Sequence, residues 1–203
     1  MVSKGEIRRE RQLDALISAA ESRIKANGLA GVKARELAND IGIAVGAIYN
    51  LVADLDELIL RVNVHTMNRL DAALLEAAPQ SSLSTRADAA RRLVAIGLAY
   101  RRFAFENMRL WRNLFEYFPP PGKALPDWAE GKDVHLIRHI CEPLRVLMAR
   151  ADEAHRYLMA RTLFSAVHGI VSLGLEDWQV GVPADEQDAQ IEKLLRIICD
   201  GLC

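Results

Sequence analysis

The chain has 203 residues, enough for one large domain or for a small domain attached to a larger one. Apolar residues make up 51% of it, ample material for a packed core, and the formal net charge of −1 at pH 7 excludes a protein that coats nucleic acid by charge alone. The three cysteines form an odd, sparse set without C-x-x-C spacing, which favours a reduced cytoplasmic protein over a disulfide-bonded secreted one.

We expect a cytoplasmic protein without a membrane partner. The first residues, MVSKGEIRRER, mix charges of both signs and lack the apolar region of a signal peptide. The longest uncharged run, Thr162 to Leu175, is shorter than the about 20 residues that a membrane-spanning helix needs, so we interpret it as a buried helix.

Helical periodicity runs through nearly every extended segment, and no stretch shows sustained two-residue alternation, so the sequence predicts an all-α fold. The first helix is predicted over Ile7–Asn27, because its apolar residues share one stripe and the following Gly28 suits a left-handed helix end. Two short helices are predicted over about Lys33–Asp40 and Val45–Leu51. A longer helix, which an aspartate can cap at its start, is predicted over residues 54–79.

The second half of the chain continues the helical pattern. "PQSSLST" (Pro79–Thr85) is predicted as a loop, and "FPPPG" (Phe118–Gly122) ends regular structure after the segment Met108–Phe115. Further helices are predicted over about residues 85–106, Trp128–Arg150 with a kink at Pro143, Asp152–Glu176 and Asp185–Leu202. The sequence therefore divides into a compact N-terminal domain, residues 1–52, and a larger helical body, residues 53–203.

The two short helices have the spacing of a helix-turn-helix. Ala38 lies four residues before Gly42, and Ile48 lies six residues after it. Two helices that cross steeply need a small residue where their backbones approach, Gly at the left-handed turn, and a branched apolar residue that locks the second helix. The second helix of such a motif enters the DNA major groove. From the residues alone, an ordinary helical hairpin is the alternative.

Polar and basic neighbours favour the DNA-binding interpretation. Tyr49 and Asn50 lie outside the locking face, where a phenol and an amide can reach a phosphate or a base edge, and Gly46 lets the backbone approach the duplex. Glu6 and Glu10 dilute the positive charge that four residues give the N-terminal segment. These four are Lys4, Arg8, Arg9 and Arg11.

A set of residues between about Leu13 and Leu60 carries a family resemblance. The set is Ala19-Ala20, Gly28, Glu36-Leu37-Ala38, Gly42-Ile43, Gly46-Ala47-Ile48-Tyr49 and Glu57-Leu58. This region resembles the DNA-binding domain of the TetR family of transcriptional regulators, and "AVHGIVSLGLE" (Ala166–Glu176) resembles the WHG-type C-terminal domain of one branch. The resemblance implies a three-helix DNA-binding domain over residues 1–52, and a ligand-binding and dimerisation domain over residues 53–203, without a cofactor.

The resemblance also implies which residues bind operator DNA: Lys33, Arg35, Val45, Gly46, Ala47, Tyr49 and Asn50. Val45 and Ala47 can contact a thymine methyl, whereas Asn50 can pair with adenine. The chain departs from many relatives, which have Ser or Thr at Val32, Ala44 and Ala47, an aromatic or His at Leu51, Phe at Val52 and Lys at Leu55. Hydroxyls and a lysine at these places hold phosphates, so a relative with weak or lost DNA binding is an alternative.

For the helical body, the resemblance implies a small-molecule effector and a four-helix bundle made by the last two helices and their copies. The predicted pocket residues are Tyr100, Phe103, Trp111, Phe115, Met148 and His168, because aromatic rings and polar tips line most small-molecule cavities. The predicted dimer interface is Leu163, Val167, Ile170, Val171, Gly174, Ile191, Leu194, Leu195 and Ile198. A homodimer also suits operator DNA, since two reading helices cover two half-sites. Internal core helices of a monomer are the alternative.

The sequence favours a regulator over an enzyme, since no nucleophile–base pair, phosphate-binding Gly loop or closed metal set stands out. His135 and His139 have the spacing of two metal ligands, but only Asp133 and Glu142 lie near them as third ligands, so we interpret them as an exposed pair and predict no metal. We predict a repressor that a small-molecule effector releases from double-stranded operator DNA. Activation, ligand binding without DNA binding, and catalysis are the alternatives.

Overall fold

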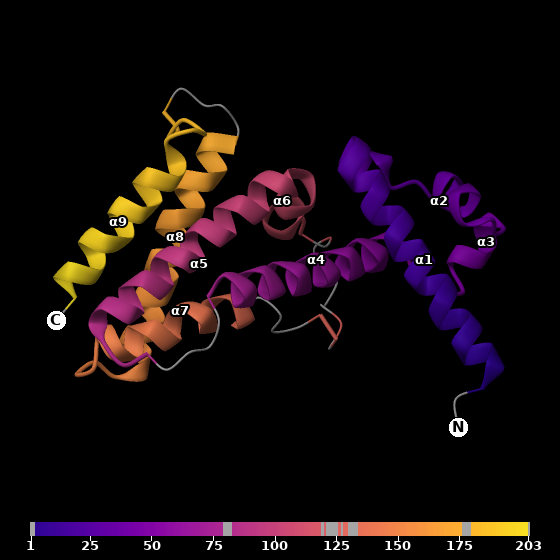
Figure 1. Cartoon of the computed structure of the whole chain (residues 1–203). Coiled ribbons are helices and arrows are strands. Elements are labelled where there is room, and N and C mark those ends of the chain that lie inside the picture. Colours follow the sequence, from indigo (N-terminus) through magenta and orange to yellow (C-terminus); the bar gives the residue numbers. More distant parts are fainter. Residues whose placement is uncertain are drawn as a thin grey trace. The chain divides into compact units, whose positions relative to one another are not determined.

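The computed structural model describes residues 3–78, 83–118, 134–175 and 180–202, and the single residues 120, 126, 128 and 129. These residues form nine α-helices and one short 3-10 helix, Leu29–Gly31, with no strand among them (Figure 1). The helices are α1 (Lys4–Asn27), α2 (Ala34–Ile41), α3 (Val45–Ile48), α4 (Leu55–Ala77), α5 (Arg86–Glu106), α6 (Met108–Glu116), α7 (Val134–Leu147), α8 (Glu153–Leu175) and α9 (Gln187–Gly201). The predicted all-α fold is confirmed.

Two compact units make up the chain. Unit 1 comprises Met1–Asn68 and Asn107–Glu130, and unit 2 comprises Arg69–Glu106 and Gly131–Cys203. The first part of α4 therefore belongs to unit 1 and its second part to unit 2, while α6 belongs to unit 1. The predicted division after residue 52 follows the helix-turn-helix alone, whereas the compact unit around it also includes α6 and part of α4.

The first helix begins at Lys4, three residues before its predicted start, because Ser3 and Glu6 form a capping box. The Glu6 N–H donates to Ser3 Oγ at 3.2 Å, and the Ser3 N–H donates to Glu6 Oε2 at 2.6 Å. These bonds satisfy two backbone donors that the start of a helix leaves without intrahelical partners. At the other end Gly28 has a φ of 64°, and the predicted end at Asn27 is confirmed.

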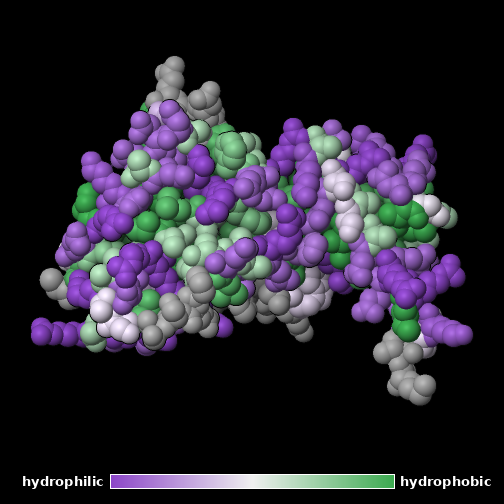
Figure 2. Space-filling model, viewed as in Figure 1, coloured by the Kyte–Doolittle hydropathy of each residue, from purple (hydrophilic) through white to green (hydrophobic). Residues whose placement is uncertain are grey.

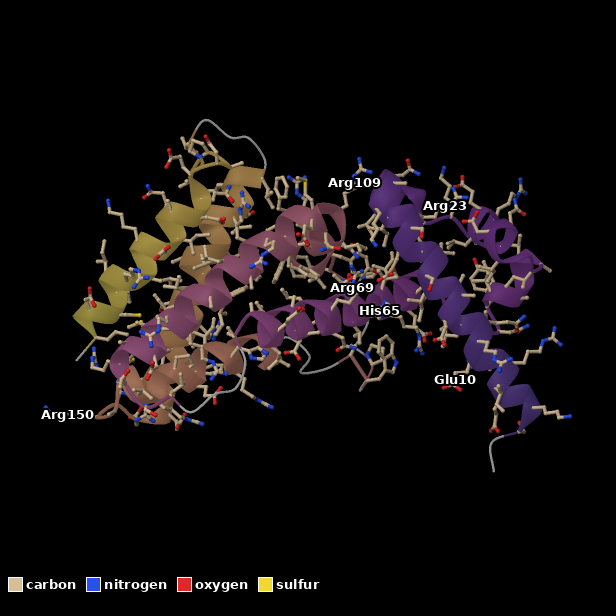
Figure 3. The ribbon with its side chains drawn as sticks, in the orientation of Figure 1. Glu10, Arg23, His65, Arg69, Arg109 and Arg150 are labelled. Carbon is tan, nitrogen blue, oxygen red and sulfur yellow. The ribbon has the colours of Figure 1, made fainter. Side chains whose placement is uncertain are left out.

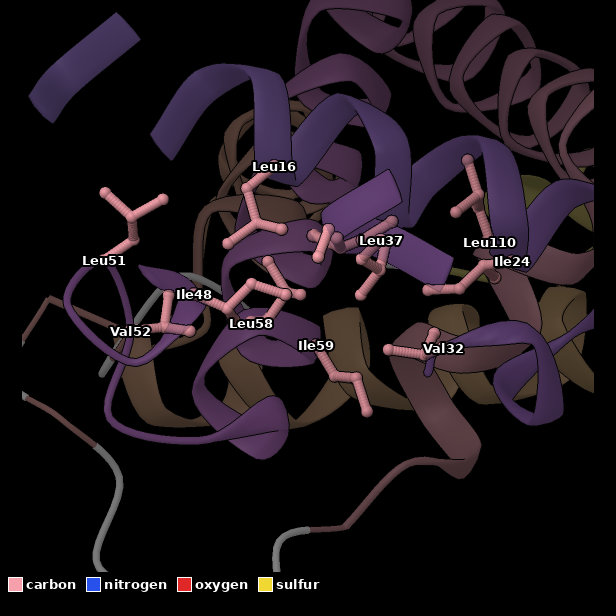
Figure 4. Packing of buried hydrophobic residues seen from close by; sticks show 13 residues of the cluster. Leu16, Ile24, Val32, Leu37, Ile48, Leu51, Val52, Leu58, Ile59 and Leu110 are labelled. Carbon is pink, nitrogen blue, oxygen red and sulfur yellow. The ribbon is translucent and has the colours of Figure 1, made fainter. Parts of the chain in front are cut away.

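The core of unit 1 is built on one apolar stripe of α1 (Figure 4). Leu16, Ala20 and Ile24 recur every four residues and are fully buried. They belong to one cluster with residues of α2, α3, α4 and α6 and of the segment after α3. These are Leu37, Ala38, Ile48, Leu51, Val52, Leu58, Ile59, Val62 and Leu110, together with Val32. Burial of each Leu or Ile stabilises the fold by about 1.5–3 kcal/mol, so the stripe holds α2 and α3 against α1.

Helix α6 is fastened to other helices of unit 1 by polar bonds. The Asn113 side-chain amide donates to Asn63 Oδ1 on α4 at 2.6 Å, and the Asn63 amide donates to the Asn113 carbonyl at 3.2 Å. Arg109 Nη1 donates to the Lys25 carbonyl near the end of α1 at 2.8 Å. These bonds explain why α6, although it follows α5 directly, is part of unit 1.

Helix α5 is central to unit 2 and packs against α7, α8 and α9. Gly97 permits the close approach of α5 and α9, since a Cβ at this position would lie 2.8 Å from Leu195 Cδ1. Arg86 donates to the Leu147 carbonyl at 2.7 Å and to the Cys199 carbonyl at 3.0 Å. The start of α5 is thereby joined to the C-terminal ends of α7 and α9.

Helix α7 differs most from its predicted bounds. It begins at Val134 rather than at Trp128, which lies in a turn where the Ala129 N–H donates to the Pro126 carbonyl at 2.8 Å. Pro143 lies inside α7, which ends four residues later at Leu147. Because proline has no N–H, it removes one helical hydrogen bond, and this weakens the helix toward its end.

Candidate nucleic-acid interface and effector cavity

The corner between α2 and α3 is a left-handed glycine turn. Gly42 has φ 67° and ψ 38°, a conformation that costs glycine little and strains other residues. The Ile43 N–H donates to the Ala38 carbonyl at 3.0 Å, and the Gly42 N–H donates to the Asn39 carbonyl at 3.3 Å. This pair of bonds is a Schellman motif, which ends α2 and starts the chain toward α3.

The segment Val45–Asn50, called the reading segment here, is held from its inner side. Ile48 is fully buried against the core, as the predicted locking residue should be. Helix α3 covers only Val45–Ile48, shorter than predicted, and continues as tight turns in which the Asn50 N–H donates to Ala47 and the Leu51 N–H to Ile48. Leu51 is itself buried, so the chain leaves the helix to enter the core.

Arg9 holds the end of the reading segment. Its Nε donates to the Asn50 carbonyl at 3.3 Å and its Nη2 donates to the Leu51 carbonyl at 3.1 Å. From the sequence, Arg9 is one of the positive charges of the N-terminal segment. In the structure its side chain positions the end of the reading segment. No local sequence pattern shows this contact, because its partners lie more than forty residues along the chain.

The outer side of the reading segment is exposed. Tyr49 is 51% exposed, and Val45, Gly46 and Asn50 are exposed beside it, while Ala47 is half-buried. The two other predicted DNA-binding residues, Lys33 and Arg35, are exposed at the start of α2, and Lys33 Nζ lies 3.5 Å from Glu36 Oε1. All seven predicted residues thus belong to unit 1, and none of the seven is buried.

Helix α2 is fastened to α1 by a residue that the sequence did not indicate. Arg23 of α1 makes two 2.8 Å hydrogen bonds to the Asp40 carboxylate and one of 2.5 Å to Glu36 Oε2. The bound guanidinium lowers the pKa of Asp40 below its ordinary value. This network fixes the orientation of α2 on α1. Because α3 follows α2 through the Gly42 turn, the network also helps to fix the orientation of α3.

Three exposed cations form a stripe on α1, called the basic stripe here: Lys4, Arg8 and Arg11. Their spacing of four and three residues puts them on one face of the helix. Glu6 and Glu10 fall on other faces, and in Figure 3 Glu10 points away from α2 and α3. The helical geometry therefore separates the two acidic residues from the positive charge of the basic stripe.

Unit 2 encloses a narrow apolar cavity between its helices. Eleven residues line it: Leu74, Leu93, Ile96, Gly97, Tyr100, Leu136, Ile140, Leu163, Phe164, Val167 and Leu195. The centre of a water-sized sphere can occupy about 30 Å³ of it, room for roughly two water molecules. The Tyr100 hydroxyl lies 2.7 Å from His168 Nδ1, and burial lowers the pKa of His168, which favours the neutral ring.

Comparison with known proteins assigns the chain to a family. A family model described as "Tetracyclin repressor-like, C-terminal domain" matches residues 93–198, more than half of the chain. The chain is a TetR-family transcriptional regulator. The matched range includes Ala166–Glu176, where the sequence resembles the WHG-type domain. Because the TetR family is non-enzymatic, the alternative of an enzyme is set aside.

A search of curated proteins gave no match. Among solved structures, a protein of unknown function from Rhodococcus sp. RHA1 has a TM-score of 0.73 at 23% identity, over 94% of this chain and 95% of that one. A TetR-family transcriptional regulator from Streptomyces coelicolor has a TM-score of 0.68 at 17% identity, over 95% and 83%. A TetR-like transcriptional regulator from Rhodococcus sp. RHA1 has a TM-score of 0.61 at 17% identity, over 99% and 100%. They share the TetR fold.

Only one of the six predicted pocket residues of this TetR protein, Tyr100, lines the cavity. The predicted residue His168 is hydrogen-bonded to the Tyr100 hydroxyl. Phe103 is buried on another side of α5. Trp111 and Phe115 pack against each other on α6, with ring centroids 5.5 Å apart and the rings tilted by 60°, and belong to unit 1. Met148 follows α7 and is not among the lining residues. Phe164, which the sequence analysis missed, lines the cavity and packs edge-on against Tyr100.

Five of the nine predicted dimer-interface residues are buried in the core of unit 2: Leu163, Val167, Val171, Ile191 and Leu195. Their burial within their own chain leaves almost no surface for a partner. Gly174 is likewise occupied from within, because a Cβ there would collide with Gln187. Ile170, Leu194 and Ile198 are half-buried and keep some exposed surface.

His139 is not part of an exposed histidine pair. Its side chain is 12% exposed, and its Nε2 lies 2.6 Å from Asp71 Oδ1, so it joins α7 to the second part of α4 within unit 2. The side chain of His135 lies outside the described residues. Within the described part of the chain, no group of three His, Cys, Asp or Glu residues could hold a metal ion.

Helix α8 is long and apolar enough, by length and composition, to cross a membrane. The uncharged run Thr162–Leu175 within it is shorter than α8, and a few charges do not prevent membrane insertion. Core helices of soluble proteins pass the same test. The TetR family is soluble, and less than a quarter of the most apolar stretch of α8 is buried by its own chain.

Proposed function

We propose that this TetR-family protein is a repressor that binds operator DNA as a dimer and leaves it when a small-molecule effector enters unit 2. The observation that carries the proposal is the exposed reading segment, which follows the Gly42 corner and is held from inside by Ile48. A buried inner side combined with an exposed outer side is what insertion into a major groove requires.

The residues of the reading segment have distinct roles in this proposal. The Tyr49 phenol reaches a phosphate or a base edge, and the exposed Asn50 amide can pair with adenine. The Val45 side chain supplies apolar contact to a thymine methyl. Lys33 and Arg35, at the start of α2, contact the neighbouring backbone phosphates.

The basic stripe replaces phosphate anchors that this chain lacks. Ala44, Ala47 and Leu55 stand where many relatives have hydroxyls or a lysine, and these apolar side chains cannot donate to a phosphate. Three exposed cations on α1 supply positive charge in the same unit, and Arg9 connects their helix to the end of the reading segment. Phosphate contacts of this kind position a protein on the duplex without reading its sequence.

The dimer forms through the face of α8 and α9 that the chain leaves exposed. Leu158 on α8 and Ile197 on α9 are 63% and 61% exposed, and apolar side chains interrupt the hydrophilic surface over these helices in Figure 2. A Cβ at Gly169 or Gly201 would meet no atom within 4 Å, so both positions leave room for a partner's helices. A dimer places two reading segments about 34–36 Å apart, one turn of DNA.

Effector release follows from the size of the cavity. Its present volume holds roughly two water molecules, so a larger molecule must separate the side chains of α5, α7 and α8 that line it. An effector that binds this expanded state better shifts the population toward it, by no more than the difference between its two affinities. The continuous helix α4 and the junction between α5 and α6 connect unit 2 covalently to unit 1.

Binding to the intergenic DNA beside the protein's own gene tests the proposal. The full-length protein is titrated in gel-shift and fluorescence anisotropy experiments, with scrambled DNA of equal length as control. We expect sequence-selective, salt-sensitive binding without effector, and loss of this selectivity in Tyr49→Ala. A selection from the whole genome could also find that neither the wild type nor Tyr49→Ala binds any fragment selectively. That result would favour the alternative of a TetR-like ligand-binding protein that has lost its operator.

A further inference from the structure

The described residues that line the cavity of unit 2 carry no charge. All of them are aliphatic or aromatic, apart from Gly97. The hydroxyl of Tyr100 is bonded to His168, which is not a lining residue, so Tyr100 contributes its ring to the lining. Burial lowers the pKa of His168 and favours its neutral form, so the residue behind Tyr100 adds no charge either.

This lining selects ligands by charge. A carboxylate, phosphate or ammonium group would lose its hydration on entering the cavity and would gain no ionic partner there, which is costly. A hydrocarbon group gains free energy on entry, roughly in proportion to the apolar area that it removes from water. A bound water molecule needs two to four polar partners, which the lining does not supply, so water competes poorly for the space.

The cavity lies where five helices of the chain meet. One leucine from each of α4, α5, α7, α8 and α9 lines it: Leu74, Leu93, Leu136, Leu163 and Leu195. On α5 the lining extends over seven residues, from Leu93 to Tyr100, about 10 Å along the helix axis. This length matches one six-membered ring with a short alkyl chain. In an engineered protein, an apolar cavity lined by Leu, Ile and Phe binds benzene.

We propose that the effector is an uncharged, apolar molecule, whose hydrocarbon part is about as large as one ring with a short alkyl chain and fills this cavity. This names the ligand class of the effector site and rests on the proposed function only in that binding releases the operator. The ligand is recognised by its shape and by its lack of charge, because the lining offers no ionic partner.

Hydrocarbons and charged analogues of the same shape test this inference directly. The full-length protein is titrated by calorimetry with ethylbenzene, phenylacetate and benzylammonium, and with butylbenzene, 4-phenylbutanoate and 3-phenylpropylammonium. In each set a carboxylate or an ammonium replaces the terminal methyl of the hydrocarbon. We expect at least one hydrocarbon to bind, and to bind tenfold or more tightly than both of its charged analogues. Binding of neither hydrocarbon, or equal binding of a charged analogue, would overturn the inference.

A matched pair of substitutions on α8 locates the site. Val167 lines the cavity, whereas Val171, one turn further, is fully buried and is not a lining residue. Val167→Ile adds one methylene group to the cavity, so hydrocarbon affinity should fall at least fivefold while the melting temperature holds or rises. Val171→Ile adds the same group to packed core, so the melting temperature should fall while hydrocarbon affinity stays within about twofold.

Equal changes of hydrocarbon affinity in the two variants would contradict the inference, because binding would then not depend on the cavity. Circular dichroism spectra check that both variants fold. The comparison of hydrocarbons with their charged analogues uses the wild type and needs no variant.

Operator binding measured on the same preparation separates this inference from the proposed function. Hydrocarbon binding without selective DNA binding would overturn the proposed repressor and leave the ligand class intact. Selective DNA binding by a protein that binds neither hydrocarbon would overturn the ligand class alone. Hydrocarbon binding that leaves operator affinity unchanged would show that the cavity is a packing void and not an effector site, which also overturns the inference.

Discussion

The basic stripe of α1 makes a quantitative prediction about salt. If Arg8 and Arg11 each neutralise one phosphate, the double variant Arg8→Ala/Arg11→Ala loses two phosphate contacts in each protomer and four in the dimer. The slope of log K against log salt concentration is about −0.9 for each phosphate contact. We therefore expect the slope of the variant to be less steep than that of the wild type by about 3.6.

Fluorescence anisotropy with the operator at several salt concentrations measures this slope. Between 50 and 200 mM salt, the wild-type affinity should fall about a hundredfold more than that of the variant. Because both arginines are exposed, the melting temperature should change little. The control is Arg138→Ala/Arg150→Ala, which removes the same charge from exposed arginines of unit 2.

The control distinguishes local contact from net charge. If loss of net charge alone weakened binding, the two double variants would behave alike. An unchanged slope in Arg8→Ala/Arg11→Ala, or an equal change in the control, would show that the basic stripe does not contact the operator backbone. Tyr49→Ala gives the complementary pattern, since the loss of an uncharged side chain's contact lowers affinity while the salt slope is nearly unchanged.

Further predictions concern the reading segment and the dimer. Tyr49→Ala should weaken operator binding at least tenfold and change the free energy of unfolding by less than about 0.5 kcal/mol, because half of the side chain is exposed; an equal loss of folding stability would refute this. Arg9→Ala should lower the free energy of unfolding in urea by about 1 kcal/mol and weaken operator binding. Arg9→Lys should not restore both the stability and the operator affinity, since one ammonium does not reproduce a guanidinium that bridges two carbonyls. Ile197→Glu should give a monomer in light scattering, whereas Phe105→Glu, at a similarly exposed position of α5, should stay dimeric; a dimeric Ile197→Glu would exclude this face as the interface.

The helix-turn-helix could be predicted because its determinants are local. Ala38, Gly42 and Ile48 lie within eleven residues, and each is required by the backbone geometry of the corner. The end of α1 was predicted for the same reason, since glycine after an apolar stripe ends a helix. The earlier start of α1 could have been found too, because Ser3 and Glu6 have the spacing of a capping box.

The predicted dimer-interface residues include a stripe that is buried within the chain, for a physical reason. Periodicity identifies the most apolar face of a helix, and in α8 this face, with Leu163, Val167 and Val171, fills the core of unit 2. The face left for a partner is less apolar, with Leu158 and Gly169 among polar residues.

Candidate pocket residues could be chosen from the sequence only by residue type, because a single sequence does not show which helices are neighbours. Tyr100 and His168 are 68 residues apart, and each was indicated by its residue type alone. Trp111 was indicated by residue type in the same way, but it follows Glu106 and so belongs to unit 1, whereas the cavity lies in unit 2.

The magnitudes of the proposed contacts are sufficient for regulation. Burial of one methylene group contributes about 0.8 kcal/mol, and a tenfold change in operator affinity needs about 1.4 kcal/mol. Two such groups of a ligand, buried only in the expanded state of the cavity, would therefore weaken operator binding at least tenfold. Helix α6 offers a route for this effect, because it follows α5 directly and Tyr117, one residue after its end, donates to Asp56 on α4 at 2.6 Å. Arg109 ties the same helix to α1, which carries Arg9 and so holds the end of the reading segment.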